Sequence, residues 1–263
     1  MPEVLPFLIA FCGVLGLLIG SFLNVVIWRV PRGESVVSPP SHCPGCDAPI
    51  APRDNIPVVS WLLLRGRCRH CQEPISPRYP FVEALTGVVF ALLAWHFGLA
   101  WELPAYLYLG AVGIALAAID LDTHRLPNVL TLPSYGVLAA LLLLPAAIDD
   151  RWDDYLRAAI GGAALFAFYF LLVLVYPKGM GFGDVKLAGV LGIALGWLGW
   201  GSVIVGGFLG FLLGALVGGG MMVLGKAGRK SKIPFGPFMV AGAFLAIFVG
   251  QALADWYLGL TGL

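Results

Sequence analysis

The stretch LPFLIAFCGVLGLLIGSFLNVVIW, residues 5–28, is an apolar run that contains no charged side chain. About 20 apolar residues are enough to cross the hydrocarbon core of a bilayer as an α-helix. No Lys or Arg precedes the run, and it is longer than the apolar region of a cleavable signal peptide. We therefore expect it to remain in the protein as a membrane helix.

Similar apolar stretches recur along the rest of the chain. The sequence is 59% hydrophobic and only 12% charged, whereas soluble globular domains carry about 25% charged residues. This composition excludes a water-soluble globule and predicts an all-α polytopic membrane protein. We expect about eight transmembrane helices, at residues 5–28, 82–100, 103–119, 127–148, 156–176, 185–200, 202–224 and 234–255.

The basic residues predict how these helices are oriented. If the N-terminus lies outside, every Lys and Arg except Arg151 and Arg157 falls on the inner side, including Lys178 and the four basic residues of 226–232. Cytoplasmic loops are enriched in Lys and Arg. We therefore expect both termini to lie outside the cytoplasm.

The only long polar segment of the chain, residues 31–80, then lies in the cytoplasm. It contains two CxxC pairs, Cys43 with Cys46 and Cys68 with Cys71. Each CxxC turn presents two sulphurs on one side of a tight loop, and two such turns can close a tetrahedron around Zn²⁺. We expect three parts in the chain: a first transmembrane helix (1–30), a zinc-binding insert (31–80) and a membrane core (81–263).

Disulfides or unconnected cysteines are the alternatives to zinc. Cytoplasmic thiols stay reduced, which disfavours disulfides. Four protein ligands would make the zinc site structural rather than catalytic, and structural zinc contributes about 10 kcal/mol or more to the folding of small peptides. His42 and His70 are interpreted as neighbours of the ligands, and Cys12 as a packing residue of the first helix.

Few acidic residues lie at membrane depth or at its edge. They are Glu83, Asp120, Asp122 and Asp184. Ionisable groups in such places are costly and suggest a function. Asp120 closes the third apolar stretch and Asp184 opens the sixth, so the predicted topology puts both on the cytoplasmic side.

Two adjacent carboxylates can share one proton, so that one acts as a base on water and the other donates a proton to a carbonyl oxygen. This is the chemistry of aspartic peptidases. A helix N-terminus favours an anion, which predicts Asp184 as the resting base and Asp120, at a helix C-terminus, as the resting acid. The alternatives are that Asp122 replaces Asp120, or that the acids only cap helices or pair with Arg125 and Lys186.

Several motifs, in order, resemble the type IV prepilin peptidases, which belong to the GxGD class of intramembrane aspartic peptidases. The resemblance extends over about residues 13–250. It rests on the GxGD sequence of Gly181, Gly183 and Asp184, on the paired CxxC turns, and on the stretches at 20–29, 78–83, 119–122, 126–128 and 183–187.

The resemblance implies an enzyme with two activities. Such enzymes cleave the basic leader of type IV prepilins or type II secretion pseudopilins after a glycine, at the cytoplasmic membrane face. They then methylate the new N-terminal residue with S-adenosyl-L-methionine. The resemblance makes Asp120 and Asp184 the catalytic residues, associates the insert with methylation, and implies a bacterial cytoplasmic (inner) membrane protein whose active sites face the cytoplasm.

The sequence also offers candidates for binding the substrate or the methyl donor. The chain has no dinucleotide-type glycine fingerprint after a predicted strand. The candidates are Gly181, Gly183, Lys186, Asn24, Arg29 and Glu83. We expect prepilin or pseudopilin substrates and membrane lipid as partners, and no nucleic acid.

Three other functions are compatible with parts of this pattern. A proton-coupled transporter also uses acids within a helix bundle, although these acids lie at predicted helix ends. A non-catalytic scaffold could use the zinc insert for docking, and a GxGD peptidase could act on another substrate. The glycines at 206, 210, 214 and 218 form one smooth helix face, which we interpret as internal packing rather than a dimer contact.

Overall fold

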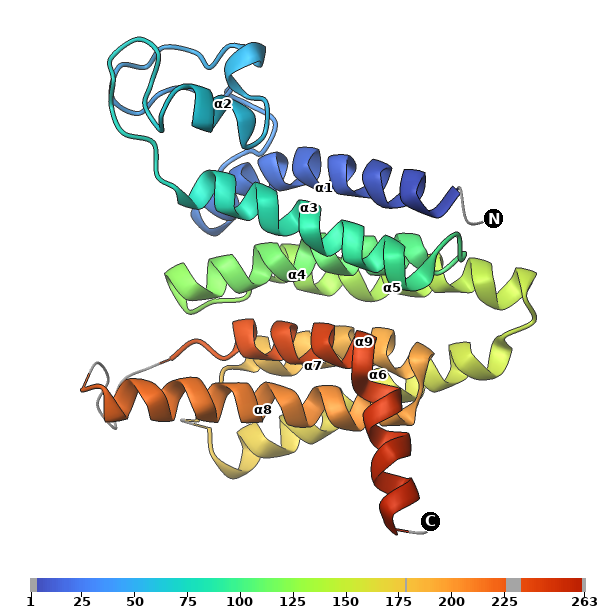
Figure 1. Cartoon of the computed structure of the whole chain (residues 1–263). Helices are drawn as coiled ribbons and strands as arrows, with labels where there is room; N and C mark the ends of the chain where they lie inside the picture. The colour runs from blue at the N-terminus through green and yellow to red at the C-terminus, as the bar shows by residue number, and fades with distance from the viewer. Residues whose placement is uncertain (1–3, 178, 226–232, 262–263) are drawn as a thin grey trace. The chain divides into compact units, whose positions relative to one another are not determined.

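The computed structural model describes residues 4–177, 179–225 and 233–261. Lys178 and the basic residues at 226–232, which entered the orientation argument, lie outside the described residues. Within the described ranges the chain is helical, and it forms no strand beyond two isolated bridges. The long helices are α1 (Val4–Arg29), α3 (Arg78–Phe97), α4 (Leu103–Thr123), α5 (Asn128–Ile148), α6 (Trp152–Val175), α7 (Phe182–Leu198), α8 (Trp200–Val223) and α9 (Gly236–Thr261) (Figure 1).

Over these ranges, seven helices are long and apolar enough to cross a membrane. The remaining long helix, α7, has 17 residues, of which 12 are buried. At 1.5 Å per residue α7 is about 25 Å long, close to the thickness of the hydrocarbon core. The predicted all-α polytopic membrane fold is therefore confirmed, with each expected span matched by a helix.

The chain divides into two compact units, Met1–Ala115 and Leu116–Leu263. In the first unit, α1 and α3 lie side by side through small residues. A Cβ atom placed on Gly16 would come within 2.7 Å of the Thr86 carbonyl oxygen, and one on Gly20 within 2.7 Å of the Glu83 Cα atom. Glycine therefore allows the two backbones to approach this closely.

In the second unit α7 is the central helix, and it packs against α5, α6, α8 and α9. The seam between α6 and α7 is made of facing glycines. A Cβ atom on Gly192 would lie 2.5 Å from the Gly161 carbonyl oxygen, and one on Gly196 would lie 2.7 Å from the Arg157 carbonyl oxygen. Arg157 also donates hydrogen bonds of 2.7 and 2.8 Å to the carbonyl oxygens of Gly196 and Trp197, which end α7.

The glycine face of α8 is used within the same unit. Cβ atoms on Gly206, Gly210 and Gly214 would meet Ala246, Met239 and Phe235 respectively, within 3.1 to 3.4 Å. Ala246 and Met239 belong to α9, and Phe235 precedes it. The interpretation as internal packing is confirmed.

The insert between α1 and α3 contains two 3₁₀ turns, η1 (Val30–Arg32) and η2 (Pro52–Asp54), and one short helix, α2 (Val59–Leu63). Its many prolines lack an N–H donor and prevent longer helices. Turns account for most of the segment, and its described residues form two isolated bridges but no strand.

Candidate active site and metal centre

Asp184 lies in the first turn of α7 and is only 8% exposed. Its Oδ2 atom accepts a hydrogen bond of 3.1 Å from the Gly181 amide. The carboxylate therefore folds back on the residue that precedes its own helix, and this fixes the side-chain orientation. Gly183 allows the Leu126 side chain to approach the start of α7 closely, because a Cβ atom on Gly183 would lie 3.1 Å from Leu126 Cβ.

Asp120 lies in α4, three residues before the helix ends at Thr123, and is 5% exposed. Its Oδ2 atom accepts a hydrogen bond of 2.9 Å from the amide of Gly236, the first residue of α9. Asp122, the rival candidate, is exposed. Burial therefore favours Asp120 over Asp122 as the partner of Asp184.

The structure places the two aspartates in the second unit, and both are buried. Each carboxylate accepts one backbone amide, that of Gly236 for Asp120 and that of Gly181 for Asp184. Two such acids share one proton when their carboxylates are adjacent. The arrangement has the parts that general acid–base hydrolysis requires: two carboxylates, each oriented by one backbone amide.

Asp120 lies in the last turn of α4, at the helix C-terminus as expected. The assignment of acid and base from helix polarity loses its support, however. Asp120 also accepts the first amide of α9, just as Asp184 lies at the N-terminus of α7. Both carboxylates therefore face the positive end of a helix dipole.

A second set of contacts holds the start of α7 against α5. The Lys186 ammonium donates a hydrogen bond of 2.8 Å to Asn128 Oδ1 and lies 4.9 Å from the Phe182 ring centroid. The Tyr135 hydroxyl donates a hydrogen bond of 2.7 Å to the Lys186 carbonyl oxygen. These contacts fix the turn of α7 that carries Asp184.

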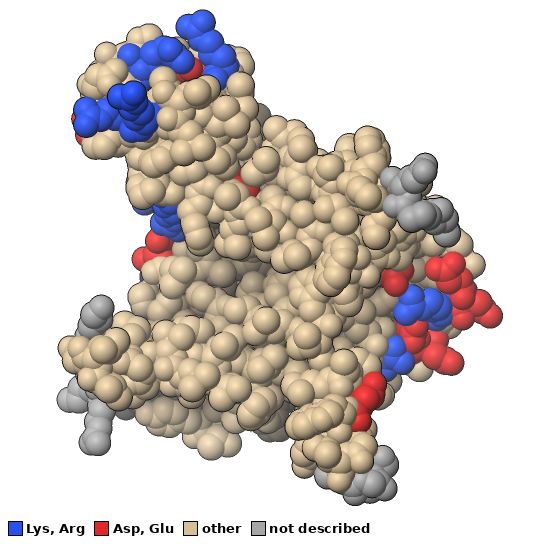
Figure 2. All heavy atoms as spheres, in the orientation of Figure 1, with Lys and Arg blue, Asp and Glu red and all other residues tan. Residues whose placement is uncertain are grey.

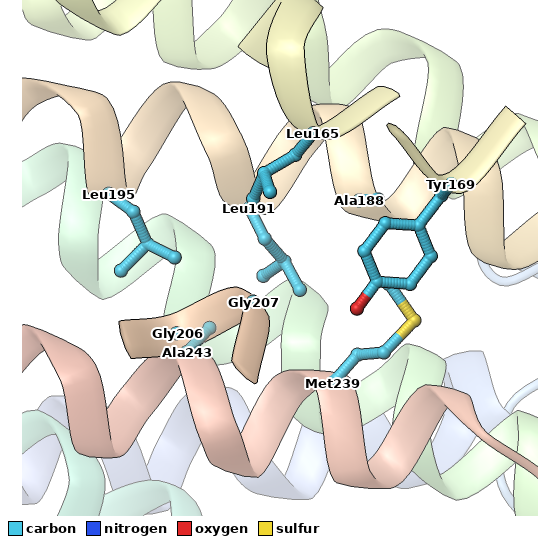
Figure 3. Close-up of a pocket in the computed structure, with 9 residues that line it drawn as sticks. All are labelled: Leu165, Tyr169, Ala188, Leu191, Leu195, Gly206, Gly207, Met239 and Ala243. Atoms are coloured by element: carbon cyan, nitrogen blue, oxygen red, sulfur yellow. The ribbon is translucent and has the colours of Figure 1, made fainter. Parts of the chain in front are cut away.

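A small cavity lies deeper in the same unit (Figure 3). It measures about 10 Å³ and is lined by residues of α6, α7, α8 and α9. Tyr169 and Met239 meet at one end of it, and Leu195 lies at the other. This volume holds about one water molecule, so the cavity is a packing gap and not a substrate pocket.

The four cysteines of the insert come together as predicted. Their sulphur atoms all lie within 4.8 Å of one another, and the Cys43 and Cys71 sulphurs are 3.6 Å apart. Tetrahedral zinc with Zn–S bonds of 2.3 Å requires sulphurs about 3.8 Å apart. The donor set and its spacing therefore fit a metal ion of the zinc type.

The two cysteine turns share one backbone design. An isolated bridge flanks each turn, His42 with Pro49 and Arg67 with Pro74. A residue with positive φ follows the second cysteine of each turn, Asp47 at 55° and Gln72 at 61°. In the second turn, the amides of Cys71 and His70 point at the Cys68 sulphur and lower the pKa of that thiol to about 6. These backbone donors stabilise the thiolate of Cys68, which is the form that binds metal.

Three candidate residues of the first unit contact the insert, two of them at its ends. Asn24 donates a hydrogen bond of 3.2 Å to the Tyr79 carbonyl oxygen. Arg29 donates to the carbonyl oxygens of Ser35 and Pro39 at 2.9 and 2.7 Å. Each side chain thus binds backbone where the insert meets a membrane helix.

Glu83, the third of these residues, binds the middle of the insert. It accepts a hydrogen bond of 2.7 Å from the Val58 amide, whose residue has a φ of 62°. A β-branched residue rarely adopts positive φ. The Glu83 carboxylate therefore holds a strained backbone position directly before α2.

Sequence reasoning missed Gly236 and Tyr135. Gly236 lies 116 positions from the aspartate that it contacts, and Tyr135 falls within an apolar run. The available signal for Gly236 was its place between Phe235 and Pro237 at the start of the last apolar stretch. Proline at such a position marks a helix start, and a glycine beside it suggests close approach of another group.

Comparison with known proteins gives consistent matches along the chain. Residues 14–97 match the Bacterial Peptidase A24 N-terminal domain, and residues 107–223 match the Type IV leader peptidase family. No solved structure matches the chain.

Curated relatives named prepilin leader peptidase/N-methyltransferase are similar over most of the sequence. The protein from Stutzerimonas stutzeri is 37% identical, with 96% of this chain and 95% of the relative covered. The one from Neisseria gonorrhoeae is 42% identical over 73% of this chain and 75% of the relative. The one from Pseudomonas aeruginosa is 36% identical over 98% and 96%.

Proposed function

Because this chain belongs to the type IV leader peptidase family, we propose that it cleaves the leader peptide of type IV prepilins or type II secretion pseudopilins after a glycine, and then methylates the new N-terminal residue. The peptidase activity is supported above all by the pair of buried carboxylates, Asp120 and Asp184, each oriented by one backbone amide.

In the proposed hydrolysis the two aspartates share one proton. The ionised carboxylate takes a proton from water while the protonated one donates to the oxygen of the scissile carbonyl. Water oxygen bonds to the carbonyl carbon, and the C–N bond then breaks as the leaving amine takes up a proton. Neither step requires a metal ion.

The glycines at 181 and 183 are proposed to leave room for an extended substrate beside Asp184. Lys186 is proposed to support this site through the start of α7, because its ammonium binds Asn128 at 2.8 Å.

The insert is proposed to bind Zn²⁺ through Cys43, Cys46, Cys68 and Cys71. With four thiolates the ion would stabilise the fold of the segment. We propose that the insert serves methyl transfer from S-adenosyl-L-methionine, and that Asn24, Arg29 and Glu83 support this activity where the insert joins α1 and α3.

The chain is a multi-pass membrane protein, and we propose the bacterial inner membrane as its location, with both active sites on the cytoplasmic face and both termini outside. A prepilin has a basic leader followed by an apolar helix, so its scissile bond lies at that membrane face. The distribution of Lys and Arg along the chain supports this orientation.

A cleavage assay tests the catalytic assignment. Purified enzyme would be incubated with a prepilin and S-adenosylmethionine, and the product followed by intact mass. We expect Asp120→Asn and Asp184→Asn each to slow leader removal by at least about 100-fold, because each removes one partner of acid–base catalysis. Asp122→Asn, the exposed neighbour, is the matched control and should cleave at the wild-type rate.

A second substrate separates the two activities. A pilin supplied without its leader should be methylated by both Asp→Asn variants, since methyl transfer does not need peptide hydrolysis. Full cleavage by either Asn variant would refute the aspartic mechanism. Loss of cleavage in Asp122→Asn alone would move the catalytic role to that residue.

A further inference from the structure

The short helix α2 exposes apolar side chains although it is not one of the membrane spans. Val59, Leu62 and Leu63 are 47%, 61% and 78% exposed. Their spacing of three and four residues puts them on one helix face, and Ile56 precedes that face by one turn. A group of large exposed apolar side chains outside the spans indicates a contact surface.

The opposite face of α2 is tied into the insert. The Ser60 hydroxyl accepts a hydrogen bond of 3.0 Å from the Ile56 amide and donates one of 2.9 Å to the Arg53 carbonyl oxygen. The Trp61 indole donates a hydrogen bond of 3.0 Å to the Ile75 carbonyl oxygen. These bonds fix the rotation of α2, so its apolar face must point away from the insert.

The depth of α2 follows from its link to a membrane helix. The amide of Val58, which precedes α2, donates to the Glu83 carboxylate at 2.7 Å. Glu83 lies five residues into α3, which is about 7.5 Å along the helix axis. The start of α2 is therefore level with the second turn of a helix that crosses the bilayer.

The neighbouring end of α1 has the features of a membrane interface. Trp28 is 56% exposed, and the Arg32 guanidinium lies 3.6 Å above its ring. Tryptophan is enriched where membrane helices leave the hydrocarbon core. The end of the first unit that carries α2 therefore lies at this interface.

Basic residues flank α2 in the sequence, with Arg53 before it and Arg65 and Arg67 after it. Arg53, Arg65 and Arg67 are exposed, whereas Arg69 is bound to Asp54 in an ion pair of 2.6 Å. Figure 2 shows basic side chains gathered on the insert. An apolar helix face with arginines close by in the sequence is typical of segments that lie in the membrane interface, where phosphate headgroups attract the charges.

We propose that α2 lies in the interface of the bilayer that α1 and α3 cross. Val59, Leu62 and Leu63 contact the upper part of the acyl chains, while Arg53, Arg65 and Arg67 contact anionic phospholipid headgroups. The insert is thus held against the membrane surface by α2 in addition to its two covalent connections. This placement does not depend on the peptidase or methyltransferase chemistry.

Photo-crosslinking of the full chain tests this placement. The photoreactive residue p-benzoylphenylalanine replaces Leu63 in one protein and Glu73, exposed in the second cysteine turn, in a matched control. Both proteins are reconstituted in vesicles of phosphatidylethanolamine and phosphatidylglycerol, irradiated and digested. We expect phospholipid adducts on the peptide that carries position 63 and at least about fivefold fewer at position 73.

Bound zinc, measured in both labelled proteins, verifies that the insert is folded. The label at Leu62 repeats the test from a second position on the same face. Adducts to a second copy of the chain would overturn the proposal. The absence of lipid adducts at both position 62 and position 63 would overturn it as well. Equal lipid adducts at positions 63 and 73 would overturn it too, because they would mean unspecific contact.

The headgroup contact has its own test. In vesicles of phosphatidylcholine alone we expect the adduct yield at position 63 to fall at least about threefold, because the arginines lose their anionic partners. Replacing Arg53, Arg65 and Arg67 by Gln should remove this dependence on lipid charge. Equal yields in the two lipid mixtures would refute the role of the arginines.

Discussion

Gly236 is the residue that orients Asp120, and its lack of a side chain is part of that role. Its amide donates to Asp120 Oδ2 at 2.9 Å. A Cβ atom on Gly236 would lie 2.8 Å from the same oxygen and 3.3 Å from the carboxyl carbon. Any larger residue must therefore push the carboxyl group away from the amide that orients it.

Replacing Gly236 by Ala should impair the chemistry of the site rather than the fold. We expect kcat for leader cleavage to fall at least about 10-fold with KM nearly unchanged, since a displaced acid acts mainly in the transition state. The matched control is Gly136→Ala in α5, where an added Cβ atom meets nothing within 4 Å. A Gly236→Ala enzyme with wild-type kcat would show that this contact is not needed.

At the scale of single residues, the sequence indicated the groups that carry the chemistry but not those that orient them. Asp120 and Asp184 stood out because acids are costly at membrane depth. Gly236 and Tyr135 carry no unusual chemistry, and they matter only because the fold brings them beside residues far away in sequence.

At the scale of elements, the seam between α6 and α7 is the most sensitive to added volume. Gly192→Ala would put a methyl group 2.5 Å from the Gly161 carbonyl oxygen, which belongs to the backbone and cannot rotate away. We expect a loss of about 1–3 kcal/mol in the free energy of unfolding. Unfolding in mixed detergent micelles measures it.

Gly219→Ala in α8 is the control for that substitution, because nothing lies within 4 Å of its added Cβ atom. It should be neutral or slightly stabilising, since alanine favours helices more than glycine does. Equal stability of the Gly192→Ala and wild-type proteins would mean that the two helices are farther apart than described.

The fold of the zinc-binding insert should be independent of the fold of the membrane helices. Cys46→Ser should reduce bound zinc and expose the insert amides to hydrogen exchange, because the segment has little core of its own and metal binding contributes about 10 kcal/mol or more. Exchange in α5 to α9 should stay unchanged. The control is Cys12→Ser, because Cys12 is a buried residue of α1. This variant should bind as much zinc in the insert as the wild-type protein does. A general loss of membrane insertion in Cys46→Ser would contradict this division.

Element boundaries were harder to predict than element identity. The apolar pattern located each long helix, but α3 begins at Arg78 and α4 ends at Thr123, four residues beyond the apolar runs that predict them. Helices continue past the bilayer into water, where hydropathy no longer marks them. The error matters here because Asp120 lies in that extension.

At the scale of the whole molecule, the proposed orientation predicts which loops reach each side of the membrane. Alkaline phosphatase fused after residue 150 or after the C-terminus should be active in cells, because these points lie outside. A fusion after residue 125 should be inactive, because it lies in the cytoplasm. The reverse pattern would invert the topology and place the aspartates on the wrong side for a basic leader.

Composition and the apolar stretches were sufficient to predict a polytopic helical protein, and cysteine spacing was sufficient to predict the four-cysteine cluster. The packing partners were not predictable. That α7 would be the central helix of the second unit follows from glycines on several helices that match in space, and no periodicity within one helix reveals such a match.

The burial of α7 has an evolutionary consequence. A lipid-facing residue such as Phe208 of α8, 62% exposed, can be exchanged for another apolar residue because fluid lipid adapts to its shape. A residue of α7 borders several helices, so each exchange needs simultaneous changes in its neighbours. Among related chains, α7 should therefore accumulate substitutions most slowly. Its sequence similarity should remain detectable after the outer faces of α8 have diverged.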